Sequence, residues 1–143
     1  MLYVGTNKPL PRTSWVKEAP DFHVRSLTEY DVAIRSHFSK PEVQYIGSTS
    51  GCGCDFPHVL EGDGSWPMVE DAEVDEEYEA SKRFNREALV SLLRKSSEEM
   101  IELYGVWAGD FDERPKARED VSLDRILDSG FYFKEQGFYR ITL

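Results

Sequence analysis

The sequence predicts an α+β fold: a mixed or mostly antiparallel sheet, one principal amphipathic helix and a C-terminal β-hairpin. Three observations indicate it. Short strand-like segments alternate with helix-like ones, one long segment has its apolar residues at helical spacing, and an aromatic-rich tail is divided by Gln136 and Gly137. A length of 143 residues fits a single domain over residues 1–143, because about 150 residues per domain is the usual expectation.

The first half of the chain predicts three strands and a short helix. Residues 2–5 are apolar, residues 22–27 alternate apolar with polar side chains, and residues 43–47 end in glycine, so each segment is expected to be a strand. A helix is expected over residues 29–37, with Thr28 as its N-cap and acidic residues in its first turn. The side chains expected to be buried along it are Tyr30, Ala33, Ile34 and Phe38.

The second half contains the most strongly predicted helix, over residues 76–96. Its apolar side chains form one stripe: Phe84, Ala88, Leu89, Leu92 and Leu93. Residues 100–107 are expected to form a strand, and residues 110–120 a charged loop. A short helix is expected over residues 123–128, capped by Ser122. The aromatic runs of residues 131–143 then predict the hairpin.

Charge and hydropathy exclude two classes of partner. The net charge of −10 disfavours general nucleic-acid binding, because phosphate backbones attract lysine and arginine. No run of 18 apolar residues is present, so no membrane partner is expected. The N-terminal segment lacks the basic start and long apolar stretch of a signal peptide, which favours the cytoplasm, where thiols remain reduced.

The feature that most suggests a function is the loop at residues 47–58, with the sequence GSTSGCGCDFPH. It holds both cysteines of the chain, Cys52 and Cys54, which are separated by one glycine and followed by His58. Thiolates and imidazoles are the ligands that zinc prefers, and a structural zinc site needs four of them. The sequence therefore suggests a small binding or regulatory module that holds a thiophilic metal, zinc first, at this loop.

The metal ligands expected from this pattern are Cys52, Cys54, His58 and His23, with His37 as the alternative fourth ligand. Two alternatives use the same loop differently. One cysteine could act in thiol redox chemistry or as an enzyme's nucleophile activated by a histidine. The glycines and serines could instead bind an anion through backbone N–H groups.

A further alternative assigns no chemistry to the loop. In this interpretation the cysteines only fill space under a turn, and the protein is an interaction domain that forms a homodimer or binds another protein through acidic and aromatic surfaces. The spacing of the two cysteines is not the C-x₂₋₄-C pattern of zinc fingers, so the sequence leaves these hypotheses open.

Overall fold

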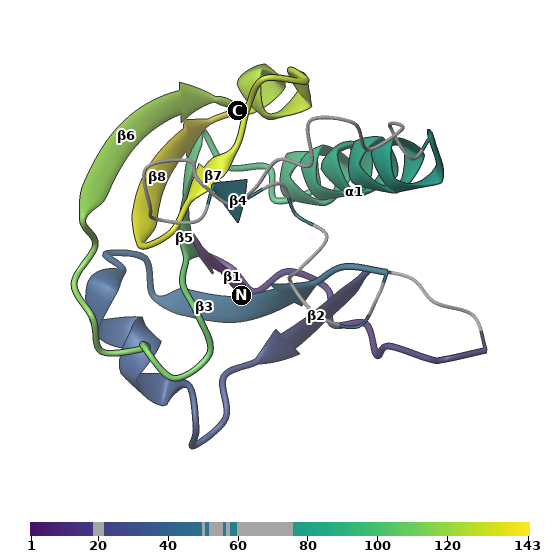
Figure 1. Cartoon of the computed structure of the whole chain (residues 1–143). Coiled ribbons are helices and arrows are strands. Elements are labelled where there is room, and N and C mark those ends of the chain that lie inside the picture. The colour runs from purple at the N-terminus through teal and green to yellow at the C-terminus, as the bar shows by residue number, and fades with distance from the viewer. Residues whose placement is uncertain (19–21, 50, 52–55, 57, 60–75) are drawn as a thin grey trace.

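A six-stranded mixed sheet in the order β2-β3-β1-β5-β8-β6 forms the centre of the fold (Figure 1). The computed structural model describes residues 1–18, 22–49, 51, 56, 58–59 and 76–143. The strands of the sheet are β1 (Leu2–Thr6), β2 (His23–Ser26), β3 (Glu42–Gly47), β5 (Met100–Gly105), β6 (Ala117–Ser122) and β8 (Gly137–Thr142). All neighbouring strands are antiparallel except β6 and β8, which are parallel, so the predicted α+β class and sheet type are confirmed.

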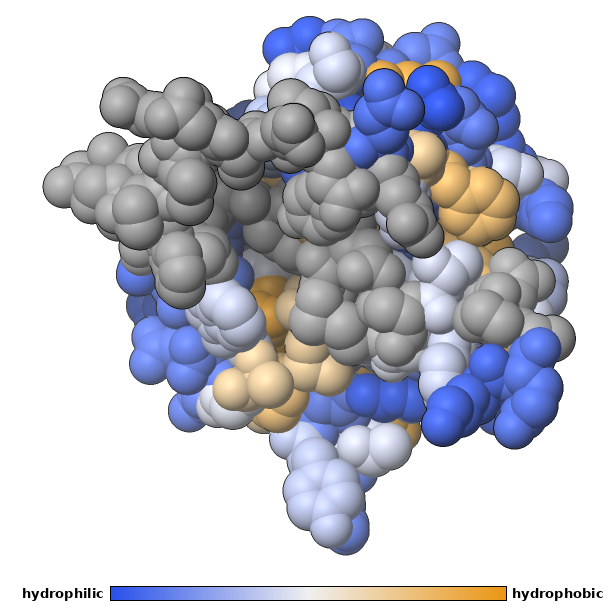
Figure 2. Space-filling view, turned by 45° about the vertical axis from the view of Figure 1, so that its right-hand side comes forward, coloured by the Kyte–Doolittle hydropathy of each residue, from blue (hydrophilic) through white to orange (hydrophobic). Residues whose placement is uncertain are grey.

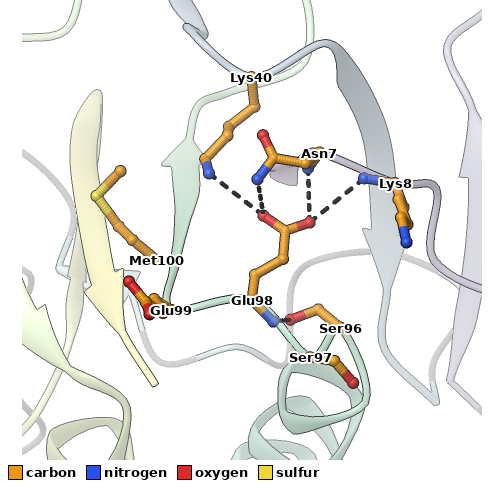
Figure 3. Close-up of a pocket in the computed structure, with 8 residues that line it drawn as sticks. All are labelled: Asn7, Lys8, Lys40, Ser96, Ser97, Glu98, Glu99 and Met100. Carbon is orange, nitrogen blue, oxygen red and sulfur yellow. Dashed lines mark hydrogen bonds and ion pairs between the residues drawn. The ribbon is translucent and has the colours of Figure 1, made fainter.

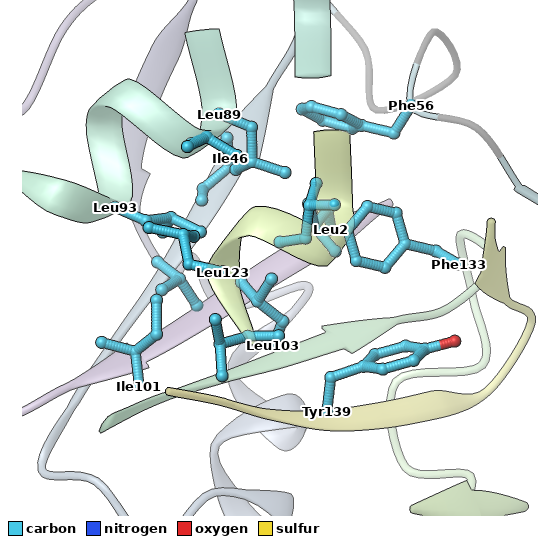
Figure 4. Close-up of a cluster of buried hydrophobic side chains, with 14 of the residues drawn as sticks. Leu2, Ile46, Phe56, Leu89, Leu93, Ile101, Leu103, Leu123, Phe133 and Tyr139 are labelled. Atoms are coloured by element: carbon cyan, nitrogen blue, oxygen red, sulfur yellow. The ribbon is translucent and has the colours of Figure 1, made fainter. Parts of the chain in front are cut away.

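One face of the sheet packs against the helix α1 (Glu76–Arg94), which confirms the helix predicted for this region (Figure 1). Strand alternation directs Leu2 of β1 and Ile101 of β5 to this face, where they meet Leu89 and Leu93 of the helix (Figure 4). Phe133 and Tyr139 complete the cluster at the C-terminal end of the chain. These side chains are at most 1% exposed and form the main core.

The opposite face is covered in part by the 3₁₀ helix η1 (Val32–His37). Tyr3, Tyr104 and Phe138 point to this face from three strands and pack against Ile34 and Phe38. The aromatic rings on this face pack edge to face or at a tilt. Phe38 and Phe138, for example, are tilted with ring centroids 5.4 Å apart. The sheet therefore has a second, smaller aromatic core.

The short helix predicted over residues 29–37 is a 3₁₀ helix that begins later and buries less than expected. Tyr30 is 81% exposed and Ala33 is exposed, while Ile34 and Phe38 are buried as predicted. Thr28 is not the cap: its N–H and hydroxyl donate to Asp31, the residue that precedes the helix. The Asp31 carboxylate thus folds back onto the preceding turn instead of capping the helix.

The buried face of α1 differs from the predicted stripe. Phe84 is 53% exposed, whereas the polar residues Asn85 and Arg86 are buried with Leu89 and Val90. Arg86 donates from Nη2 to the carbonyl oxygens of Ser129 and Phe131, at 3.2 Å each. Such hydrogen bonds make burial of a polar side chain possible, and hydropathy alone does not indicate them.

Two further elements differ from the predicted arrangement. Residues 117–120, predicted as part of a loop, belong instead to the edge strand β6, whose residues are only half-buried or exposed. The C-terminal turn lies where predicted, with Gln136 at a positive φ of 54°, but its flanking strands pair elsewhere. β7 (Phe133–Lys134) pairs with β4 (His58–Val59) in a separate two-stranded sheet, while β8 joins the main sheet. The short helix η2 (Leu123–Leu127) lies where expected.

The visible surface of the described residues is mostly hydrophilic, with hydrophobic residues in separate patches (Figure 2). Over all of the described residues, the large hydrophobic side chains that are exposed include Trp15, Tyr30, Phe84, Trp107 and Tyr132. None of the helices in the described part combines the length and the apolarity that a bilayer crossing requires.

Candidate functional site

The structure places one of the four predicted metal ligands completely. His23 begins β2 and lies opposite Gly47, the last residue of β3. The cysteine loop leaves the sheet directly after Gly47, so His23 lies at the base of this loop. The backbone of His58 lies in β4 beside Phe133, and its side chain is outside the described part, as are Cys52 and Cys54.

His23 is a buried imidazole with an unusual environment. Its side chain is 8% exposed, and its Nδ1 atom is buried with no hydrogen-bond partner among the described residues. Burial, and then the positive charge of Arg25, lower its pKa below the usual value of 6.5. These effects favour the neutral imidazole, which is the form that binds metals and accepts hydrogen bonds.

Gly47 is required by the position of this ring. A Cβ atom built on Gly47 would lie 1.7 Å from Cε1 and 2.3 Å from Nδ1 of His23, well inside contact distance. The imidazole therefore lies directly on the backbone of β3, and its ring centroid is 5.4 Å from that of Tyr45. Only glycine permits this approach.

We expect Gly47→Ala to displace the His23 ring and to lower the free energy of unfolding by about 1–3 kcal/mol, the usual range for overpacking. Urea denaturation of the variant against the wild type measures this effect. Gly130→Ala is the matched control, because a Cβ atom there meets no atom within 4 Å. Equal stability of both variants would contradict the close contact between His23 and Gly47.

The first residues of the cysteine loop are held by α1 and by Trp15. Asn85 of α1 is fully buried, and its Oδ1 lies 3.4 Å from the N–H of Thr49. The indole N–H of Trp15 donates to the carbonyl oxygen of Thr49 at 3.0 Å. Gly51 has a positive φ of 85°, which favours glycine, and a Cβ atom there would lie 3.1 Å from the Trp15 ring.

Phe56 fixes the chain on the other side of the two cysteines. It is 1% exposed and packs edge to face against Phe22, with ring centroids 5.3 Å apart. The segment that carries Cys52 and Cys54 is thus bounded by Gly51 on Trp15 and by Phe56 in the core. Gly51 and Phe56, which flank this segment in the sequence, thus both contact other parts of the fold.

A charged cluster lies near Tyr45, whose ring contacts both His23 and Arg25. The Asp31 carboxylate is 2% exposed and pairs with Arg25 at 2.7 Å, while the Tyr3 hydroxyl donates to it at 3.1 Å. Burial alone would raise the pKa of Asp31, but hydrogen bonds from Arg25 and Thr28 outweigh it and hold the pKa below its usual value. Burial beside this carboxylate raises the pKa of Tyr3.

A second polar network ties the connection between α1 and β5 to the segment after β1 (Figure 3). The Glu98 carboxylate accepts hydrogen bonds from the N–H groups of Asn7 and Lys8, at 2.6 and 3.3 Å, and from the Asn7 side chain at 2.9 Å. Lys40 Nζ lies 3.3 Å from the same carboxylate. The residues of this network line a cavity of about 540 Å³. The hydrogen-bond donors there already bind the Glu98 carboxylate.

Sequence patterns did not indicate several residues that shape these sites. Asn85 and Trp15, which hold the cysteine loop, lie far from it in the sequence, and neither belongs to a recognisable motif. Gly47 carried one signal, since it ends a strand next to a glycine-rich loop. His37, the alternative ligand, lies in η1 with its Nε2 atom 3.0 Å from the carbonyl oxygen of Phe111.

Among the described residues, no three side chains of histidine, cysteine, aspartate or glutamate are arranged to hold a metal ion. Both cysteines are outside that part of the chain. Comparison with protein-family models, with curated proteins and with solved structures found no match to this sequence.

Proposed function

We propose that this protein is a small binding or regulatory module that holds a thiophilic metal, zinc first, at the cysteine loop. The ligands in this proposal are Cys52, Cys54, His58 and His23. The observation that carries it is the His23 imidazole at the base of the loop, with a buried nitrogen that has no partner among the described residues.

An unpartnered buried nitrogen is costly, by about 1–3 kcal/mol, unless a ligand satisfies it. Burial lowers the pKa of His23 and so favours the neutral imidazole, which is the form that a metal binds. Two thiolates and two imidazoles satisfy tetrahedral zinc, with about 2.3 Å to sulfur and about 2.0 Å to nitrogen.

His23 is supported over His37 as the fourth ligand. The His37 ring packs against Tyr104, with centroids 5.2 Å apart, and one ring nitrogen already has a partner in the Phe111 carbonyl oxygen. His23 lies beside the residue from which the loop starts. The pair therefore provides a matched test, because both are histidines of the same fold and only one is expected to bind metal.

The test is a zinc titration of reduced protein in competition with a chromophoric chelator, repeated with cobalt to observe the visible absorption of a tetrahedral thiolate site. We expect His23→Ala and Cys52→Ser each to weaken zinc binding by at least tenfold, on the order of the effects known for altered metal sites. His37→Ala is expected to bind zinc as the wild type does. Circular dichroism establishes that each variant is folded.

Two results would overturn the proposal. Unchanged zinc affinity in both His23→Ala and Cys52→Ser would place any metal elsewhere. Absence of saturable zinc binding by the reduced wild type would rule out the proposed metal site. In that case, rapid alkylation of one cysteine at pH 6 would indicate thiol chemistry. Slow alkylation of both cysteines would favour the hypothesis that the protein is an interaction domain.

A further inference from the structure

A second cavity, of about 400 Å³, lies on the sheet face opposite α1, between β5, β8 and β6. Its lining includes Ser39, Met100, Glu102, Arg118, Phe138 and Arg140. Known small-molecule sites have volumes of about 300–1,000 Å³ and combine an apolar surface with a few fixed polar groups. This cavity has both, since Phe138 and Met100 supply apolar surface and the other side chains carry charge or a hydroxyl.

Two of the charged residues that line the cavity, Arg140 and Glu119, already have ion-pair partners. Arg140 is held by Asp120 in a two-point contact, Nε to Oδ1 at 2.5 Å and Nη2 to Oδ2 at 2.7 Å. Glu119 pairs with Lys134. The Arg118 guanidinium and the Glu102 carboxylate have no ion-pair partner within 4 Å among the described residues. Glu102 lies opposite Arg140 in the sheet and interacts with it electrostatically, but the hydrogen bonds of Arg140 go to Asp120.

Arg118 is fixed by an aromatic ring instead of an acid. Its guanidinium carbon lies 4.5 Å from the centroid of Phe138, the residue directly opposite it in β8. A cation over a ring face is attracted by the ring's quadrupole, and the planar guanidinium keeps its edge available for a carboxylate. Arg118 thus presents an oriented cation at one side of the cavity.

Glu102 presents the opposite charge and keeps room for one more donor. Its side chain is 4% exposed, and it accepts hydrogen bonds from the Ser39 hydroxyl at 2.5 Å and from the N–H groups of Ser39 and Lys40 at 2.9 and 3.3 Å. Both N–H groups bind Oε2, and only the hydroxyl binds Oε1. A carboxylate has about four acceptor positions, so Oε1 retains one.

We propose that this cavity binds a small zwitterion, with its carboxylate at Arg118 and its ammonium at Glu102. The strands β5 and β6 lie on either side of β8, about 10 Å apart, because adjacent strands are about 4.8 Å apart. Glu102 and Arg118 are also offset by two residues along β8, because they lie opposite Arg140 and Phe138. Opposite charges on non-adjacent strands with this offset favour a ligand whose charges are several bonds apart, such as an ω-amino acid or a short peptide. Met100 and Phe138 then contact its apolar chain.

The test is calorimetric titration of the full chain with 6-aminohexanoate, and with hexylamine and hexanoate as partners that each lack one charge. We expect saturable binding of the zwitterion at least tenfold tighter than binding of either partner. Arg118→Gln is expected to remove this preference over hexylamine, because it removes the carboxylate contact. Arg94→Gln, a change at another exposed arginine that pairs with Asp124, is expected to leave it intact.

Glu102→Gln tests the contact between Glu102 and the ammonium group. If Glu102→Gln fails to fold, Arg118→Gln still tests the proposal, because Arg118 is exposed. Hexanoate binding as tightly as the zwitterion would overturn the proposal and leave a carboxylate site at Arg118 alone. Hexylamine binding as tightly would overturn it too, as would absence of saturable binding by all three compounds. The proposal is independent of metal at the cysteine loop, so zinc-free protein serves equally well.

Discussion

Replacing Leu93 with alanine is expected to lower the free energy of unfolding by about 3–5 kcal/mol, the range for deleting a buried leucine side chain. Leu93 is 0% exposed and lies in the main core between α1 and the sheet (Figure 4). A domain of this size has a total stability of about 5–15 kcal/mol, so the variant would lose a large share of it. Urea denaturation followed by circular dichroism measures the difference.

Leu92→Ala is the matched control, since Leu92 is the neighbouring residue of the same helix and is only partly buried. We expect Leu92→Ala to lower the free energy of unfolding clearly less than Leu93→Ala does. If both substitutions cost the same, the face that α1 turns toward the sheet would be different from the one described here.

Replacing Asp31 with alanine is expected to cost about 2–4 kcal/mol at pH 7. The substitution leaves the Arg25 guanidinium, the Tyr3 hydroxyl and the Thr28 N–H without their shared acceptor. Breaking a buried ion pair costs about 3–5 kcal/mol, and we expect less here because Arg25 is 34% exposed. Tyr3→Phe removes one of these hydrogen bonds and is expected to cost about 1 kcal/mol.

The contribution of Asp31 also has a defined pH dependence. Its pKa in the folded protein lies below the ordinary 3.8, so the folded state favours the charged form. The resulting stability is fully present above the unfolded pKa and is lost as the pH falls through the folded pKa. Urea denaturation from pH 6 to pH 2 should therefore show the difference between wild type and Asp31→Ala shrinking below about pH 4. A difference that stays constant down to pH 2 would contradict a lowered pKa.

The sequence predicted those elements whose burial follows a simple hydropathy period. β1, β3 and α1 were found where the apolar patterns place them, because each packs apolar side chains against the core. β6 was missed because its backbone pairs with β8 while its side chains remain half-buried or exposed, so no alternation appears in the sequence. The burial of Asn85 and Arg86 depends on hydrogen bonds to distant segments, which a period of 3.6 residues does not encode.

The candidate sites could be predicted only in part, for a similar reason. The position of His23 beside the cysteine loop follows from the pairing of β2 with β3, which joins residues 24 positions apart. Neither the contact of the imidazole with Gly47 nor the packing of Trp15 on Gly51 has a signal in local sequence. The charges of Arg118 and Glu102 come together only because β8 lies between β5 and β6.

The most direct test of the proposed metal site is elemental analysis of metal per chain, on protein purified anaerobically without an affinity tag or chelator. The proposal predicts about one zinc per chain in the wild type and a clear loss in the variant that lacks Cys52 and Cys54. Wild-type protein that retains two titratable thiols and contains no zinc, copper or iron would contradict it.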